Sequence, residues 1–419
     1  MDERTSGHLK TIRSAMNNYS FDEITPRRGS LSYKWEASLP EQAHMTPGDM
    51  EDVIPMWVAD MDFKVAPCIE KALAERVSHG IFGYTHVPEE YFGTVSRWFS
   101  EVHGVFFPQE WIMYTTGIVP AISAVLKALA LPGEEVLVMT PVYNCFFSSI
   151  RNNGLVQVNC PLLRVSLPDG SFTYRMDFDL LRSLCSSPKA KVLLLCNPHN
   201  PAGRVWTEDE LSLVGKIARE NDVIVVSDEI HCEIVSPGTE YVPFARASEE
   251  NRLSSITLCS PSKSFNTAGL QIGNIITSNP RWRAAIDRAI NINEICDVNP
   301  FGVVGLLAAY SPDGRKWLEG LNKTIWRNYG ILVEKLGSLG RDFPIAKLEG
   351  TYLAWVDTSI LNMSSSEIEV SLLENEHVWV NAGQMYGEDS FIRINLACPL
   401  PTLTEGLDRI VRGLGRLRS

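Results

Sequence analysis

The sequence of 419 residues predicts an α/β fold in which a mostly parallel sheet is flanked by helices and followed by a smaller α+β domain. Two observations support this prediction. Between about residues 60 and 300, short and nearly continuous apolar runs alternate with segments of helical spacing, a pattern typical of parallel strands buried on both faces. From about residue 305 this alternation stops, and one long helical segment precedes three short strand-like runs and a final helix.

The expected helices of the larger domain are amphipathic and have recognisable ends. In residues 120–131 the apolar side chains fall on one face, and a Pro-Gly pair follows. Residues 208–220 follow Thr207, a residue type that caps helices, and residues 68–79 also have helical spacing. The strands expected between these helices are the apolar runs 136–139, 192–195, 223–226, 256–258 and 273–276.

The change of pattern divides the chain into three parts. We expect residues 1–60 to form an N-terminal arm and part of the small domain, residues 61–304 the large domain, and residues 305–419 the small C-terminal domain. The elements expected in the small domain are a helix at 317–339, strands at 352–356, 378–381 and 391–396, and a closing helix at 403–417.

Composition excludes several classes of protein. The net charge of −12, from 38 basic and 50 acidic residues, argues against nonspecific nucleic-acid binding. No apolar stretch is long enough to span a bilayer, and residues 1–19 are polar without the apolar core of a signal peptide. The nine cysteines are dispersed without a Cys-x-x-Cys pair, so we expect no metal site, no disulfide framework and a cytoplasmic location.

Three of the expected strands end in polar residues of different chemistry. Lys263 follows the run 256–258, Asp228 ends the run that begins at Val223, and Asn200 lies in the loop after Leu195. Ligands of open parallel sheets bind beyond the carboxyl ends of the strands. There an amine, a carboxylate and an amide could hold pyridoxal 5'-phosphate, with the lysine forming the Schiff base and the aspartate pairing with the pyridinium nitrogen.

Two groups of residues are candidates for binding the phosphate of this cofactor. Gly117, Ile118 and Val119 precede the expected helix 120–131, and free amides at a helix N-terminus bind anions. Ser260 and Ser262 place hydroxyls in the turn that contains the lysine.

Three further side chains complete the candidate site. Tyr143 lies beyond the run 136–139, where its ring could stack on the pyridine, and His231 lies three residues after the aspartate, within reach of the phenolate oxygen. Arg393 offers a guanidinium fork that fits a substrate carboxylate. Each residue alone also has an ordinary structural explanation. The prediction therefore depends on their order along the chain: phosphate loop, aromatic ring, asparagine, aspartate, lysine and arginine.

Several longer motifs, together with this order of residues, match the pattern of a known family. They are 21–24 (FDEI), 56–63 (MWVADMDF), 228–231 (DEIH) and 262–271 (SKSFNTAGLQ). Over about residues 20–415 the chain resembles the fold-type I pyridoxal-phosphate enzymes related to aspartate aminotransferase. Within them it is similar to the cystathionine β-lyase branch of carbon–sulfur lyases, the MalY and PatB group. The resemblance implies a seven-stranded large-domain sheet.

The resemblance also implies a role for each candidate residue. Lys263 would bind the cofactor covalently and Asp228 would pair with its ring nitrogen. Asn200 would contact the phenolate oxygen and Tyr143 would stack on the ring, both next to the reacting atoms, while Arg393 would bind the substrate carboxylate. Neither nucleic acid nor membrane is an expected partner.

Other positions refine the resemblance. Tyr84 matches a tyrosine that reaches the phosphate of a neighbouring subunit, which implies a homodimer with shared active sites, and Trp57 would lie with Asn200 beside the substrate. His231 and Gln271 stand where many aminotransferases have tyrosine and arginine, as expected for the lyase branch. The segment between Trp35 and Met56 is longer than expected and leaves the substrate open.

The activity implied by the resemblance is β-elimination from a cysteine thioether, cystathionine or another S-conjugate, to a thiol, pyruvate and ammonia. Four alternatives stay open at this point. They are an aminotransferase that uses the same residues, a lyase dedicated to a natural-product conjugate, a decarboxylating relative, and a non-catalytic regulator.

Overall fold

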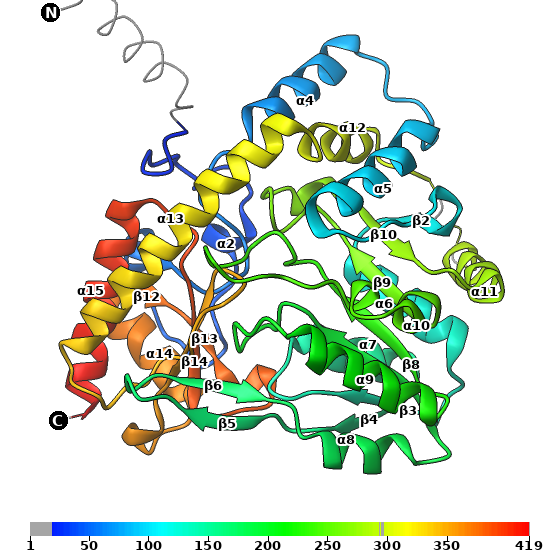
Figure 1. Ribbon diagram of the computed structural model, residues 1–419. Coiled ribbons are helices and arrows are strands. Elements are labelled where there is room, and N and C mark those ends of the chain that lie inside the picture. Colours follow the sequence, from blue (N-terminus) through cyan, green and yellow to red (C-terminus); the bar gives the residue numbers. More distant parts are fainter. Residues whose placement is uncertain (1–18, 293, 295–296, 419) are drawn as a thin grey trace, which may run out of the picture.

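A computed structural model describes residues 19–292, 294 and 297–418 of the chain (Figure 1). The first 18 residues of the expected arm lie outside the described residues. The large domain contains a seven-stranded sheet in the order β2-β10-β9-β8-β7-β3-β4, in which β10 alone runs antiparallel to its neighbours. This confirms the predicted mostly parallel sheet. Its strands are β2 (Ile112–Thr115), β3 (Glu135–Val138), β4 (Val156–Asn159), β7 (Ala190–Cys196), β8 (Ile224–Asp228), β9 (Ser255–Cys259) and β10 (Gly273–Ile276).

Helices cover both faces of this sheet because its central strands carry apolar side chains on both faces. Val192 and Leu194 of β7 pack in one core with α6 (Ile118–Leu129), α7 (Asn144–Asn152) and α11 (Pro280–Asn291). Leu193 and Leu195 pack on the opposite face with α8 (Phe178–Cys185) and α9 (Glu208–Glu220). Side chains alternate between the two faces of a strand, so a continuous apolar run requires two covering layers. The other helices of residues 19–309 are α2 (Tyr33–Glu36), α3 (Pro47–Asp52), α4 (Pro67–His79), α5 (Glu89–His103), α10 (Glu249–Leu253) and α12 (Pro300–Ala309).

The C-terminal region is an α+β unit, as predicted. An antiparallel sheet of β11 (Leu353–Asp357), β14 (Phe391–Asn395) and β13 (Asn381–Ala382) packs with α13 (Pro312–Gly337), α14 (Ser365–Glu376) and α15 (Leu400–Arg418) (Figure 1). The long helix begins five residues before the predicted start, because the Ser311 side chain accepts a hydrogen bond from the Gly314 amide and caps it. We retain the boundaries at residues 60 and 304 as a proposal.

The strand predicted at 378–381 is divided in the structure. Its first part, β12 (Val378–Trp379), pairs in parallel with β1 (Ile54–Pro55), and its second part is β13, which pairs with β14. The N-terminal segment therefore joins the C-terminal unit through β1. A hairpin of β5 (Leu163–Ser166) and β6 (Phe172–Arg175) was not predicted. Within the described part of the chain, no helix combines the length and apolar character needed to cross a membrane.

Candidate active site

The candidate residues of the large domain lie at one edge of the sheet. Asn200 follows β7, Asp228 is the last residue of β8, and Lys263 follows β9. These three strands are neighbours and parallel, so their carboxyl ends meet at the same edge. Asn200 and Asp228 are both buried, 4% and 3% exposed, as expected for groups that face a ligand rather than solvent.

The amine of Lys263 is hydrogen-bonded to the main chain and has a lowered pKa. Its Nζ donates a hydrogen bond to the carbonyl oxygen of Ala59 at 2.7 Å. Burial lowers the pKa of Lys263 from its ordinary value, with Asp60 acting in the opposite direction and Arg393 adding to the decrease. A lysine whose pKa is lowered supplies a neutral amine more readily, which is what a nucleophile or a general base requires.

Asp228 has the opposite perturbation. Burial raises the pKa of its carboxyl group to about 7, although the amide of Ile230 donates to Oδ1 at 3.1 Å and Lys263 is positively charged nearby. A buried carboxylate of this kind is stabilised by any cation that binds next to it. The ring nitrogen of a pyridinium is such a cation.

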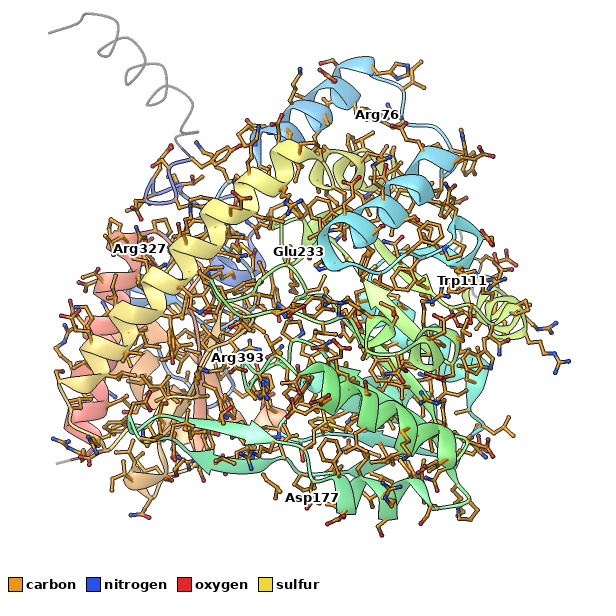
Figure 2. All side chains as sticks on the ribbon, viewed as in Figure 1. Arg76, Trp111, Asp177, Glu233, Arg327 and Arg393 are labelled. Carbon is orange, nitrogen blue, oxygen red and sulfur yellow. The ribbon has the colours of Figure 1, made fainter. Side chains whose placement is uncertain are left out.

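Arg393 reaches the same site from the C-terminal sheet. It lies on β14 and is 3% exposed, and Figure 2 places it where the C-terminal strands meet the large domain. Its Nη1 donates to Asn200 Oδ1 at 3.1 Å, and its Nη2 donates to the Trp57 carbonyl oxygen at 2.9 Å. The guanidinium lies over the ring of Tyr386, with Cζ 4.7 Å from the centroid. Its Nε is buried without a hydrogen-bond partner, and can donate to a carboxylate ligand.

His231 and Tyr143 belong to the same electrostatic environment. Burial lowers the pKa of His231 to about 3, with the charges of Lys263 and Arg393 adding to the effect, so its ring is neutral. The Nδ1 of His231 is buried without a hydrogen-bond partner. Tyr143 lies between β3 and α7; burial raises its pKa, and Asp228 contributes to the increase. Both rings can therefore act as neutral hydrogen-bonding or stacking groups in the site.

The proposed phosphate end is built on the start of α6. Gly117 precedes the helix with φ +145°, and the first turn contains no acidic side chain and no side-chain cap. Its amides, including those of Ile118 and Val119, are therefore open to an anion. The structure does not favour Ser260 as a further donor, because its one hydroxyl hydrogen is donated to the Ile272 carbonyl at 2.6 Å. Ser262, which is only partly buried, is the remaining hydroxyl candidate.

Two of the predicted residues are placed differently from the rest. Tyr84 is 96% exposed and lies in the segment between α4 and α5. The ring of Trp57 stacks on Trp379, with centroids 4.3 Å apart, and its Nε1 donates to the Lys34 carbonyl. Trp57 contacts Arg393 through its carbonyl oxygen, and not through its ring.

Sequence reasoning missed the main-chain groups of this site. The carbonyl oxygens of Trp57 and Ala59 accept hydrogen bonds from Arg393 and Lys263, respectively. The motif 56–63 identified the segment, but a main-chain carbonyl is present at every position and has no signature in residue type.

The donor set fits pyridoxal 5'-phosphate. The site combines an amine of lowered pKa, a buried carboxyl of raised pKa, two buried nitrogens without partners, and an open helix N-terminus. The amine suits the aldehyde, the carboxyl group suits the ring nitrogen, and the helix N-terminus suits the phosphate. Of the two nitrogens without partners, Arg393 Nε is available to the substrate carboxylate and His231 Nδ1 to the phenolate oxygen.

Comparison with known proteins agrees with this assignment. The family model described as aminotransferase class I and II matches residues 51–410. Cystathionine beta-lyase PatB of Bacillus subtilis is 36% identical over 94% of this chain and 100% of its own length. Protein MalY of Escherichia coli is 28% identical over 96% of this chain and 100% of its own length.

Two solved structures are similar over nearly the whole chain. Cystalysin from Treponema denticola, which contains pyridoxal 5'-phosphate, has a TM-score of 0.87 at 32% identity and covers 95% of this chain and 99% of its own. A pyridoxal-phosphate-bound C-S lyase from Staphylococcus hominis has a TM-score of 0.87 at 33% identity and covers 95% and 98%.

Proposed function

The chain belongs to the aminotransferase class I and II family, and on this premise we propose that it is a pyridoxal-phosphate-dependent carbon–sulfur β-lyase. Its substrate is a cysteine thioether, and its products are a thiol, pyruvate and ammonia. The observation that supports this most directly is the match to a cystathionine β-lyase over 94% of this chain. In the same chain, Lys263 lies close enough to Asp228 and Arg393 for their charges to act on it. Cystathionine is the default substrate because it is the one named for that relative.

The residues of the sheet edge hold the cofactor in this proposal. Lys263 would bind it covalently, Asp228 would pair with its ring nitrogen, Asn200 and His231 would contact its phenolate oxygen, and Tyr143 would stack on its ring. When bound, pyridoxal phosphate supplies an electron sink that stabilises negative charge at the substrate Cα.

The chemistry left to the protein is binding and proton transfer. Arg393 binds the α-carboxylate through its fork, whose Nε is without a partner. The Lys263 amine, once free, removes the Cα proton as the general base, a role that its lowered pKa favours. The electron pair left at Cα then forms the Cα–Cβ double bond as the Cβ–S bond breaks, and sulfur leaves as a thiolate that takes up a proton. Water then hydrolyses the released aminoacrylate to pyruvate and ammonia.

A product assay without keto acid tests the reaction class. Purified enzyme is incubated with cystathionine and a panel of other cysteine thioethers, and pyruvate and free thiol are measured together. The proposal requires both products in equal amounts from at least one thioether. An amino-group transfer that needs an added keto acid would instead establish an aminotransferase, and carbon dioxide release would establish a decarboxylase. A protein that binds cofactor but releases none of these products would support a regulator.

We also propose a homodimer in which Tyr84 reaches the phosphate bound by the other subunit. The support is its 96% exposure beside other exposed apolar residues of the same segment, Ile81 and Phe82. Isologous dimers are the commonest assembly of soluble proteins.

Subunit mixing tests the dimer. The variants Lys263→Ala and Tyr84→Phe are each expected to be weakly active, but a mixed dimer contains one site with both native residues if Tyr84 acts across the interface. Activity above the sum of the separate variants is expected after subunit exchange. Activity equal to that sum would contradict the shared site.

A further inference from the structure

We propose that residues 57–63, here called the carbonyl loop, position both Lys263 and Arg393, and that Lys34 and Asp62 are the positioning residues that hold this loop. The inference deepens the proposed function and rests on it for the roles of Lys263 and Arg393. The loop lies between β1 and α4, outside the sheet edge.

The carbonyl loop contacts the two cationic side chains through main-chain oxygens two residues apart. Lys263 Nζ donates to the Ala59 oxygen at 2.7 Å, and Arg393 Nη2 donates to the Trp57 oxygen at 2.9 Å. A carbonyl oxygen in a partly desolvated site is a strong acceptor for a cationic donor. The position of this loop therefore sets where both cations lie relative to each other.

The strand that carries Arg393 also holds the carbonyl loop. Asn395 lies two residues after Arg393 on β14, so the two side chains point to the same face. Its Nδ2 donates to the Val58 oxygen at 2.6 Å and to the Asp60 oxygen at 2.7 Å. Three neighbouring carbonyls of the loop thus contact two side chains of one strand.

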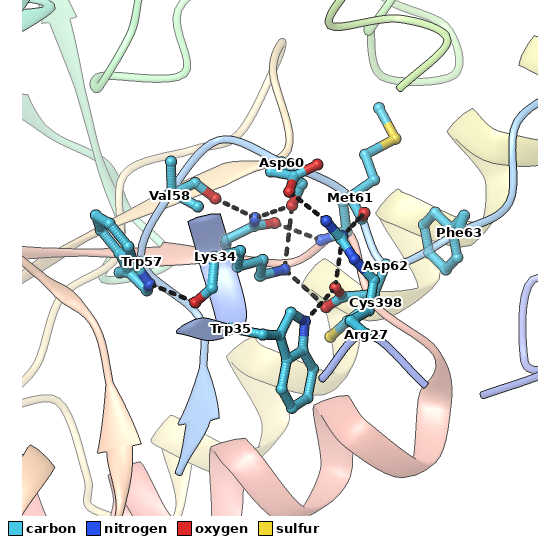
Figure 3. Close-up of polar contacts among 12 residues, drawn as sticks. Arg27, Lys34, Trp35, Trp57, Val58, Asp60, Met61, Asp62, Phe63 and Cys398 are labelled. Atoms are coloured by element: carbon cyan, nitrogen blue, oxygen red, sulfur yellow. Dashed lines mark hydrogen bonds and ion pairs between the residues drawn. The ribbon is translucent and has the colours of Figure 1, made fainter. Parts of the chain in front are cut away.

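The far side of the carbonyl loop is held by an ion-pair cluster with the N-terminal arm (Figure 3). Lys34 and Asp62 of this cluster are buried, whereas Arg27 and Asp60 are partly exposed. Lys34 Nζ lies 2.7 Å from Asp62 Oδ2, with side chains 1% and 4% exposed. The same ammonium donates to the Asp60 carbonyl at 3.1 Å. Arg27 pairs with Asp60 at 2.8 Å and with Asp62 at 3.1 Å, so the cluster contains two cations and two carboxylates.

Two further hydrogen bonds fix the geometry of the cluster, one from a neutral indole and one from the Arg27 guanidinium. Trp35 Nε1 donates to Asp62 Oδ1 at 2.8 Å, and Arg27 Nη1 donates to the Met61 carbonyl at 2.7 Å. Both carboxylate oxygens of Asp62 therefore contact the arm, while the main-chain oxygens of Trp57 and Ala59 contact Arg393 and Lys263. Because a buried ion pair adds little to stability compared with an apolar pair, a positioning role accounts for its use here.

Two variants and one control test the proposal. Asp62→Asn removes the carboxylate that pairs with Lys34, and Lys34→Met removes the ammonium while leaving Arg27 and Trp35 as donors to Asp62. Glu23→Gln is the matched control, because the Lys64–Glu23 pair is exposed and joins the same arm to the residue just after the loop. The double variant Asp62→Asn/Lys34→Met leaves neither buried charge without its partner, and it is measured beside the single variants and in place of Asp62→Asn if that variant does not fold.

The decisive readout is the reactivity of the Lys263 amine in the cofactor-free protein. An amine reagent is applied at a series of pH values, and modification of Lys263 is followed by mass spectrometry. The groups that act on Lys263 from neighbouring elements are Asp60, Arg393, Cys145 and Asp228. Because no substrate is involved, this readout stays valid even if the lyase proposal fails, and absence of lyase activity in the unmodified enzyme would be seen separately.

If the loop positions Lys263, both single variants weaken the Ala59 contact, and the reactivity profile moves to lower pH in both. The double variant moves the same way. In the loaded enzyme, kcat falls and KM rises together, by roughly tenfold to a hundredfold, because both Lys263 and Arg393 are displaced. Glu23→Gln changes none of these quantities.

Two outcomes would overturn the proposal. Charge effects alone would move the profile in opposite directions, to lower pH in Asp62→Asn and to higher pH in Lys34→Met, with no shift in the double variant. A merely structural role would lower the melting temperature of the variants and leave the pH profile of Lys263 unchanged.

Discussion

The sheet edge and the carbonyl loop both act on Lys263, but they do so with different parts of the chain. The sheet edge contributes side chains, such as Asp228 and Asn200, from the ends of parallel strands. The carbonyl loop contributes the main-chain oxygens of Trp57 and Ala59 and is held in place by a buried ion pair. The sheet edge thus supplies the side chains whose residue type matters for the reaction. The loop sets the positions of Lys263 and Arg393. Each region can be altered separately, and the consequences should differ in kind.

The largest effect is expected at the sheet edge, from Lys263→Ala. This change removes both the covalent link to the cofactor and the general base, and general acid–base catalysis alone contributes about 10²–10⁴-fold to a rate. We expect lyase activity to fall by at least about 10²-fold. Borohydride reduction and peptide mapping should find the cofactor on Lys263 of the unmodified protein, and on no lysine of the variant. Turnover that is retained in the variant would refute the assignment.

In the carbonyl loop, the largest effect is expected on stability. Asp62→Asn leaves the buried ammonium of Lys34 without its carboxylate, a change that typically costs about 3–5 kcal/mol. We expect a clear decrease in the free energy of unfolding, measured by urea titration. The exposed-pair variant Glu23→Gln should change it by less than about 0.5 kcal/mol. Equal effects of the two substitutions would show that burial of the cluster is not what makes it important.

Arg393 links the two regions, since it contacts Asn200 at the edge and Trp57 in the loop. Arg393→Ala removes the partner of the substrate carboxylate, which typically costs about 2–5 kcal/mol. KM for the thioether should rise by at least about thirtyfold. Arg393→Lys should recover part of this loss only, because an ammonium cannot reproduce the two-point contact. A KM that is unchanged in Arg393→Ala would place the carboxylate elsewhere.

The smallest predicted effect concerns the pH dependence of stability at Asp228. Its folded-state pKa of about 7 lies above the ordinary value of 3.8, so the folded state binds the proton more tightly than the unfolded state. Asp228 therefore favours folding at pH 4, and this advantage is lost as the pH rises to 7. In the cofactor-free protein, Asp228→Asn should melt a few degrees higher than the unmodified protein at pH 8, and the difference should shrink towards pH 4. A difference that does not depend on pH would contradict the raised pKa.

Much of the fold could be predicted because it depends on patterns that the sequence displays directly. The runs around Val192 and Val225 are apolar at every position, which requires a sheet covered on both faces, and the structure confirms it. The division of 378–381 into β12 and β13 could not be predicted, because each half pairs with a strand far away in the sequence. Non-local pairing leaves no trace in the local pattern.

The candidate site likewise contains residues that could be predicted from the sequence and contacts that could not. Asp228 and Lys263 could be predicted because each follows an apolar run and because the candidate residues occur in a recognisable order, and the structure brings the two to one edge. The assignment of Ser260 to the phosphate depended on its residue type alone, and the structure gives its hydrogen to Ile272. The contact between Ala59 and Lys263 joins residues 204 positions apart through a main-chain oxygen, which no residue type reveals.

The central claim is that this site eliminates a thiolate from cysteine thioethers, and counting turnovers per active site tests it most directly. Enzyme at a known concentration of bound cofactor is mixed with excess cystathionine or the best thioether of the panel, without any keto acid, and pyruvate and thiol are followed with time. The account predicts many molecules of pyruvate per site, matched by an equal amount of thiol. Product formation that stops at one keto-acid molecule per site, without thiol, would contradict it and establish an amino-group transfer.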